Sequence, residues 1–258
     1  MAAQKPLILV TNDDGITAPG LRVLIDIMNE FGDVCVVAPD SPQSGMGHAI
    51  TINNTLHCDA MPVNEDQPQQ EYNCSGTPVD CVKLAVNEIL KRKPDLCVSG
   101  INHGSNSSIN VIYSGTMSAA VEAGTQGIPS IGFSLSDYNL DADFEPVKNF
   151  VRTITKECLE NGMPAGVVLN VNFPKLKEKD IRGIKICRQA NAYWKEKFDK
   201  RTNPLGRDYY WLTGEFINQD KGEDTDEWAL KNGYVSVVPV QFDLTAHHAI
   251  KDINSWDL

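Results

Sequence analysis

Short apolar runs that no polar residue interrupts recur along roughly the first two-thirds of the chain. A run of this kind, ending in polar or glycine-rich residues, predicts a strand buried on both faces, as in a parallel sheet. Residues 49–57 instead alternate between apolar and polar side chains, which predicts a half-exposed strand. The buried strands expected on this pattern cover residues 7–10, 34–38, 96–100, 128–134 and 166–174.

Helices are expected between these strands. Pro19 suits the first turn of the first helix, and Thr77 followed by Pro78 has the form of an N-cap and a first helical residue. The expected helices cover about residues 18–31, 78–92, 117–123 and 144–161. Strands that alternate with helices in this way predict an α/β fold with a mostly parallel sheet.

The pattern changes beyond Pro174. The acidic run 223–227 is interpreted as a solvated loop or the start of a helix. The other elements expected in this part are strands at 184–188, 207–212 and 234–240 and a short helix at 228–231. We therefore expect residues 1–174 to form the core, and 175–258 to form a β-rich C-terminal extension of the same domain.

Composition narrows the class of protein. The 258 residues carry a net charge of −11, and 41% are hydrophobic, which is ordinary for a globular protein. This acidic balance argues against a nucleic-acid polymer as partner, because phosphate backbones require a basic surface. It does not exclude a small phosphorylated substrate, since a bound metal ion can reverse the local charge.

The sequence also bears on the expected compartment. We find neither the form of a signal peptide nor an apolar stretch long enough to cross a membrane, so we expect a cytoplasmic protein without a membrane partner. The seven cysteines are scattered and include no Cys-x-x-Cys pair. Reduced thiols are therefore expected rather than disulfides or a zinc site.

Two adjacent carboxylates, Asp13 and Asp14, follow the first predicted strand directly and precede Gly15. Open α/β sheets bind their ligands at the carboxyl ends of the strands, so the pair is expected at such a site. Neighbouring carboxylates repel each other, and a hard divalent cation relieves this repulsion. The alternative is that one aspartate caps the next helix and the other is solvated; Asp-Asp-Gly alone does not decide between them.

Later loops reach the same edge of the predicted sheet. Ser44 lies in a glycine-rich loop after the second strand, and Asn102, His103 and Asn106 lie in a polar loop after the third. His48 is kept as a possible phosphate contact or general acid, although a hydrogen-bonded loop histidine is the simpler interpretation.

A Ser-Gly-Thr turn before the alanine-rich helix offers a further polar site. Ser114, Gly115 and Thr116 would present hydroxyl and backbone N–H groups to an anion at the helix N-terminus. The alternative is that Ser114 or Thr116 merely caps the helix.

Taken together, the chain resembles the SurE family of metal-dependent survival-protein nucleotidases. The resemblance implies a three-layer α/β/α Rossmann-like core with a β-rich C-terminal extension. It also implies a homodimer or homotetramer that exchanges C-terminal segments. The motifs that carry it occupy residues 10–15, 37–40, 44–45, 75–78, 99–104, 113–116 and 239–245.

The resemblance further implies hydrolysis of nucleoside 5′- and 3′-monophosphates, with a possible action on short polyphosphate. The family's metal ligands map onto Asp13, Asp14, Ser44 and Asn102, which would hold one Mg²⁺ or Mn²⁺ per subunit. His103 stands where many members of the family carry arginine, so its contribution to phosphate binding would depend on pH.

These residues suggest a reaction. A water molecule activated by the metal would attack phosphorus, and Asp13 or Asp14 would accept its proton. Asn106 and the turn from Ser114 to Thr116 would bind the phosphate. A receiver-like signalling domain lacks support, because no phospho-accepting aspartate follows the later central strand. A nucleotide-binding module without turnover remains open.

Overall fold

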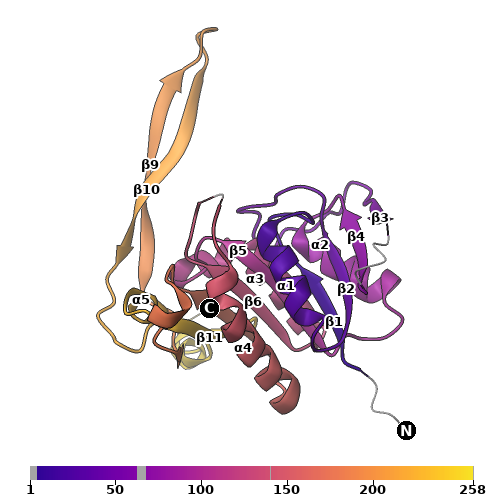
Figure 1. Cartoon of the computed structure of the whole chain (residues 1–258). Helices are drawn as coiled ribbons and strands as arrows, with labels where there is room; N and C mark the ends of the chain where they lie inside the picture. The colour runs from indigo at the N-terminus through magenta and orange to yellow at the C-terminus, as the bar shows by residue number, and fades with distance from the viewer. Residues whose placement is uncertain (1–4, 63–67, 140, 258) are drawn as a thin grey trace.

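The computed structural model of the chain describes residues 5–62, 68–139 and 141–257. Within these ranges nine strands form one sheet in the order β3-β4-β2-β1-β5-β6-β7-β11-β8 (Figure 1). All pairings from β4 to β7 are parallel, whereas β3 and β11 run antiparallel to β4 and β7. The strands are β1 (Leu7–Thr11), β2 (Asp33–Pro39), β3 (Cys58–Ala60), β4 (Gln70–Cys74), β5 (Leu96–His103), β6 (Ser130–Leu135), β7 (Val167–Phe173), β8 (Ile184–Ile186) and β11 (Val235–Gln241).

Strand β1 is buried on both faces, as its unbroken apolar run predicts. Ile8 and Val10 belong to a core cluster that includes residues of α1 and α4, whereas Leu9 belongs to a second cluster with α2 and α3. The sheet is therefore the middle of three layers, and the α/β/α fold is confirmed (Figure 1). The helices are α1 (Pro19–Met28), α2 (Pro78–Leu84), α3 (Gly115–Thr125), α4 (Lys148–Asn161), α5 (Asp226–Lys231) and α6 (Ile250–Ile253).

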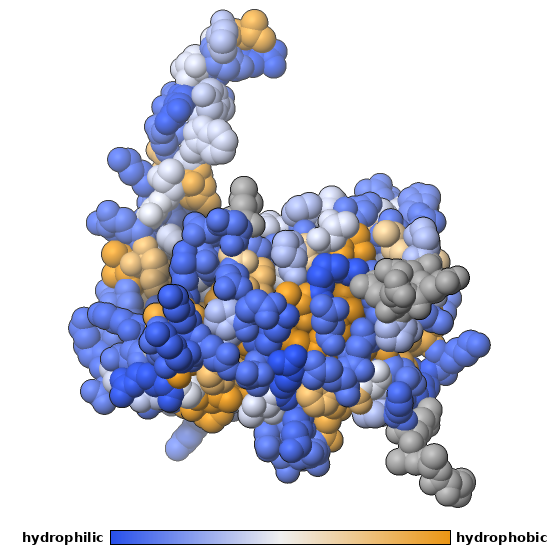
Figure 2. Space-filling view, in the orientation of Figure 1, coloured by the Kyte–Doolittle hydropathy of each residue, from blue (hydrophilic) through white to orange (hydrophobic). Residues whose placement is uncertain are grey.

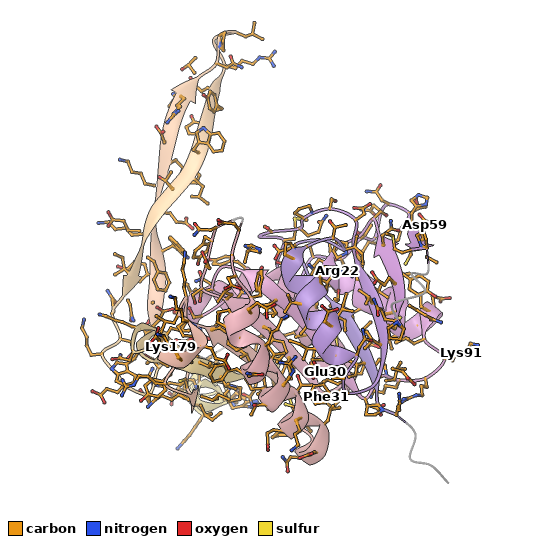
Figure 3. The ribbon with its side chains drawn as sticks, in the orientation of Figure 1. Arg22, Glu30, Phe31, Asp59, Lys91 and Lys179 are labelled. Carbon is orange, nitrogen blue, oxygen red and sulfur yellow. The ribbon has the colours of Figure 1, made fainter. Side chains whose placement is uncertain are left out.

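Two arginines tie α1 to its neighbours. Arg22 donates two hydrogen bonds, of 3.0 and 2.8 Å, to the carboxylate of Glu71 in β4. Arg152 of α4 binds Glu30, just beyond α1, in a similar fork (Figure 3 labels Arg22 and Glu30). Forked pairs of this geometry fix orientation as well as distance. They hold α1 in place over β1.

A long hairpin leaves the body of the molecule. Strands β9 (Ala192–Thr202) and β10 (Asp208–Asn218) pair antiparallel over eleven residues each and form a separate two-stranded sheet. Figure 1 shows the hairpin projecting beyond the body, and Figure 2 shows apolar side chains among its polar ones. The sequence predicted only the 207–212 portion of this hairpin.

Two other expectations were wrong. Residues 49–57 form no strand; instead Thr51 donates its N–H and its hydroxyl to the carboxylate of Asp80, so the alternating segment is held by a side chain. The helix expected at 78–92 ends at Ile89, and its last part, Ala85–Ile89, is a π-helix. The polar stretch 64–71 predicts a surface loop; residues 64–67 lie outside the described residues, and Gln70 and Glu71 belong to β4.

The sequence also predicts reduced cysteines and the absence of a membrane-spanning segment. All seven cysteines are free thiols. Among the described residues, no helix combines the length and the apolar character that crossing a membrane requires.

Candidate functional site

The two aspartates lie where β1 ends, at the carboxyl edge of the parallel strands. Asp13 is buried and accepts a hydrogen bond from the hydroxyl of Thr116 at the start of α3. Asp14 is partly exposed, and its Oδ2 accepts a hydrogen bond from the backbone N–H of His103 at 3.2 Å. Asn12 shapes the turn by donating from Nδ2 to the carbonyl of Gly15 at 3.0 Å. The pair is therefore fixed by β5 and α3 as well as by its own turn.

The electrostatics of this pair favour a cation. Burial, followed by the charge of Asp14, raises the pKa of Asp13 to about 6. Burial also raises the pKa of Asp14. Two carboxylates that are costly to ionise together fit a divalent ion, whose charge offsets both the repulsion and the loss of solvent. The donor set here thus suits a hard cation.

Close packing brings α3 against Asp13. A Cβ atom built on Gly115 would lie 2.7 Å from Cβ and 2.9 Å from Oδ2 of Asp13, so only glycine allows this approach. Ser114 caps the helix by accepting the backbone N–H of Met117 at 3.0 Å. The hydroxyl of Thr116 is engaged by Asp13. The turn therefore positions Asp13, and its role in phosphate binding stays a prediction.

Asn102 and Ser44 approach from two different elements. The sequence predicted Asn102 and His103 in a loop, but β5 runs on to His103 and includes both, whereas Ser44 lies in the loop after β2. The pairing of β5 with β6 shifts register between Ser99 and Asn102, a bulge that redirects side chains. The amide nitrogen of Asn102 donates to the carbonyl of Gly104 at 2.9 Å, which leaves its oxygen as an acceptor. Ser44 is exposed in a loop that Gln43 anchors through its N–H to the carbonyl of Asp13 at 2.7 Å.

An open pocket of about 230 Å³ unites most of these side chains. Asp14, Gly115 and Thr116 lie outside its described lining, although Asp14 and Thr116 hydrogen-bond to lining residues. His48 is also absent from this lining. Its Nε2 lies 3.1 Å from Oε2 of Glu122, which agrees with the simpler interpretation of His48 as a hydrogen-bonded loop histidine. The lining residues are Asp13, Ser44, Gly45, Asn102, His103, Gly104, Ser105, Asn106, Asn110, Tyr113, Ser114, Tyr138 and Trp194.

Asn106 and His103 occupy the pocket wall in different ways. The backbone of Asn106 binds Asn172 and Asn170, and its side-chain amide donates to Ser134 at 2.7 Å. This network fixes Asn106. None of its three hydrogen bonds uses the side-chain amide oxygen. The ring of His103 packs edge-on against Phe144, with centroids 5.1 Å apart.

Sequence reasoning missed the aromatic part of the pocket. Tyr113, Tyr138 and Trp194 line it, and Trp194 comes from β9, far along the chain from Asp13. The signal in the sequence was a cluster of aromatic residues near 193–194 and 209–211 in a region that otherwise offered few motifs.

The acidic run 223–227 leads into a helix, as one of its two interpretations had it, because Asp226 and Glu227 lie in the first turn of α5. Asp226 is buried, and its carboxylate accepts the backbone N–H groups of Ser108 at 2.7 Å and Ala190 at 2.9 Å. It thereby joins the C-terminal extension to the loop that carries Asn106.

We expect Asp226→Asn to lower the free energy of unfolding by about 2 kcal/mol, because the amide group leaves a buried N–H without its acceptor. Thermal unfolding would measure this loss, with Glu223→Gln on the exposed part of the same run as the control. Equal unfolding temperatures for the two variants would contradict the structural role of Asp226.

The fold and the pocket together define an α/β protein with an oxygen-rich, carboxylate-centred site at the carboxyl edge of its parallel strands. Residues 8–196 match the family described as Survival protein SurE. The 5′-nucleotidase SurE of Christiangramia forsetii is 73% identical over 258 residues, which cover 100% of this chain and 99% of that protein. The corresponding protein of Flavobacterium psychrophilum is 73% identical over 254 residues, 98% of each chain.

A solved structure agrees with these sequence matches. The SurE protein from Aquifex aeolicus is 40% identical, has a TM-score of 0.83, and is matched over 96% of this chain and 98% of its own. The chain belongs to the SurE family, which confirms the resemblance found in the sequence. The relatives' name places it among the phosphoric monoester hydrolases.

Proposed function

We propose that this chain hydrolyses nucleoside 5′-monophosphates, and also 3′-monophosphates, to nucleoside and phosphate with the help of one divalent metal ion. The observation that carries the proposal is the pair Asp13 and Asp14, held at the edge of the sheet beside a polar pocket. The name 5′-nucleotidase, borne by relatives over their whole length, supports the substrate class.

Four side chains would hold the ion: Asp13, Asp14, Ser44 and Asn102. Their oxygen atoms match the preference of Mg²⁺ and Mn²⁺. When bound there, the ion would polarise a phosphoryl oxygen and lower the pKa of an attacking water. Either ion fits this donor set, and the amide oxygen of Asn102 can serve as a ligand because its amide nitrogen is the group that binds Gly104.

The chain's own residues would do the rest. Thr116 keeps the carboxylate of Asp13 oriented, and His103 does the same for Asp14 through its backbone N–H. One of these carboxylates would accept the proton of the attacking water. Ser114, through its hydroxyl, and Asn106, through the amide N–H that does not bind Ser134, would orient the phosphate in the pocket, and the ring of His103 would be a further contact.

Phosphate release from a panel of nucleotides tests this function. With Mg²⁺ or Mn²⁺ supplied, we expect release from 5′- and 3′-monophosphates and slower release from short polyphosphate. Nucleotide binding without any release would favour the alternative of a binding module. Release from polyphosphate alone would contradict the proposed substrate class.

Assembly and location complete the proposal. An isolated two-stranded hairpin is marginally stable in water, and the hairpin here exposes Tyr210 and Trp211. A homodimer or homotetramer would cover these side chains and so stabilise the hairpin. Light scattering would then give the mass of two or four chains. A cytoplasmic location is the remaining part of the proposal.

A further inference from the structure

A second pocket adjoins the polar one and has a different character. Its volume is about 410 Å³. Three residues, Gly45, Tyr113 and Trp194, line both pockets, so the two spaces lie side by side. The second pocket contains no aspartate and is lined by Gly45, Tyr113, Trp194, Glu196, Leu212, Thr213 and Gly214. A polar pocket and an aromatic, largely apolar pocket therefore lie next to each other.

Trp194 is held in place although it lies on the hairpin. Its indole N–H donates to Oδ1 of Asn110 at 2.8 Å. Its ring also packs against Phe216, its partner across the hairpin, with centroids 5.4 Å apart and planes inclined by 60°. The residue nevertheless stays 42% exposed. A fixed indole with free surface is suited to stacking, because little conformational entropy is lost on binding.

Tyr113 lies at the junction of the two pockets. It directly precedes Ser114, the cap of α3 in the polar pocket, and its carbonyl accepts the N–H of Gly47 at 3.2 Å. This bond fixes its backbone against the loop that carries Ser44. The residue is 50% exposed. Its ring is thus available within a few residues of the groups that we assign to phosphate.

We infer that the second pocket receives the base of the nucleotide, stacked on Tyr113 and Trp194, while the phosphate lies beside Asp13. The inference rests on the proposed function and adds how a nucleoside is distinguished from other phosphate esters. Stacking tolerates any base because every base has a π-face. Broad base preference follows, with Glu196 and Thr213 as the polar groups on the wall that can discriminate among bases.

A third pocket, of about 480 Å³, is also lined by Trp194 and is the competing place for a base. It is lined by Tyr138 and Phe216, but also by Glu227 and Lys231. That wall carries two charged groups, the ammonium of Lys231 and the carboxylate of Glu227, which accepts a hydrogen bond from Ser107; the lining of the second pocket has one, Glu196. The less polar second pocket suits a neutral aromatic ring better.

The test compares two substrates that carry the same phosphate ester of ribose. Adenosine 5′-monophosphate has a base, and ribose 5-phosphate lacks it. Tyr113→Ala and Trp194→Ala should each lower kcat/KM for the nucleotide by about tenfold or more, mainly through KM. The same variants should change kcat/KM for ribose 5-phosphate by less than about twofold, because Ser114 and Asn106, the groups assigned to the phosphate, keep their own hydrogen bonds. Tyr113→Phe and Trp194→Phe keep a ring and should retain most of the nucleotide activity.

Two further variants make the result specific. Tyr209→Ala removes an exposed aromatic of the hairpin that belongs to neither lining set, and should have no selective effect. Tyr138→Ala should affect both substrates alike, since the hydroxyl of Tyr138 accepts the N–H of Ser105 in the polar pocket. Equal losses on both substrates in Tyr113→Ala and Trp194→Ala would overturn the inference, as would a selective loss in Tyr138→Ala. Failure of the unaltered chain to release phosphate from either substrate would instead refute the proposed function.

Discussion

Asp13→Asn is expected to reduce phosphate release from nucleoside monophosphates by about a thousandfold, the range seen when a metal-assisted or acid–base step loses its key group. The asparagine can still accept the hydroxyl of Thr116, so the turn should keep its shape. What disappears is a negative charge where the divalent ion would bind. Steady-state kinetics with saturating Mg²⁺ or Mn²⁺ would measure the loss.

The same substitution is expected to stabilise the metal-free protein. Folding raises the pKa of Asp13 from 3.8 to about 6, because burial and Asp14 disfavour its charged form. Below pH 3.8 Asp13 is protonated in both the folded and the unfolded chain, so it costs no free energy of folding. As the pH rises through 6, the folded protein loses stability, because the buried carboxylate must then ionise. At pH 7 the loss amounts to about 3 kcal/mol, and the uncharged asparagine avoids it.

Asp26→Asn provides the control for both effects, because Asp26 is an exposed carboxylate on α1. It should leave turnover and thermal stability unchanged. Full metal-dependent activity in Asp13→Asn, or a lower unfolding temperature without metal, would contradict the role that we assign to Asp13.

Gly115→Ala is expected to lower kcat by about a hundredfold, because it would displace the carboxylate of Asp13 without removing it. The new Cβ would lie 2.7 Å from Cβ of Asp13, so either the aspartate or the first turn of α3 must move. Overpacking of this kind also costs about 2 kcal/mol of stability. Activity per folded molecule and thermal unfolding should be measured on the same sample.

Gly124→Ala is the matched control, at the other end of the same helix. Its Cβ would lie 2.5 Å from Cγ1 of Val168, so it is crowded to a similar degree but far along α3 from the aspartates. It should lose stability while its folded fraction keeps kcat. If the two variants had the same kcat, the close approach of Gly115 to Asp13 would not matter for turnover.

The central sheet could be predicted because a strand that is buried on both faces has an unbroken run of apolar residues. Strand β1 reads as an unbroken apolar run, since Ile8 and Leu9 face different cores. The edges could not be predicted in this way. Residues 49–57 alternate like a strand, yet the carboxylate of Asp80 supplies the partner that a neighbouring strand would have supplied. In the exposed hairpin, side-chain alternation carries little information about burial.

The same distinction applies to the site. Asp13 and Ser44 follow two buried strands, and Asn102 lies near the carboxyl end of a third, so chain order alone places them at one edge of the sheet. The positioning role of Thr116 was not predicted, because a helix-capping residue and a carboxylate partner look alike in sequence. Trp194 reaches the pocket through the hairpin, and its contact with Asn110 joins residues 84 positions apart. Such long-range contacts have no local pattern.

Phosphate release from adenosine 5′-monophosphate by metal-stripped protein, before and after Mg²⁺ or Mn²⁺ is restored, tests the account most directly. We predict no release from the stripped protein and full recovery at one ion per chain. Equal release with and without metal would contradict the site built on Asp13, Asp14, Ser44 and Asn102. No release with either metal would contradict the proposed hydrolysis itself.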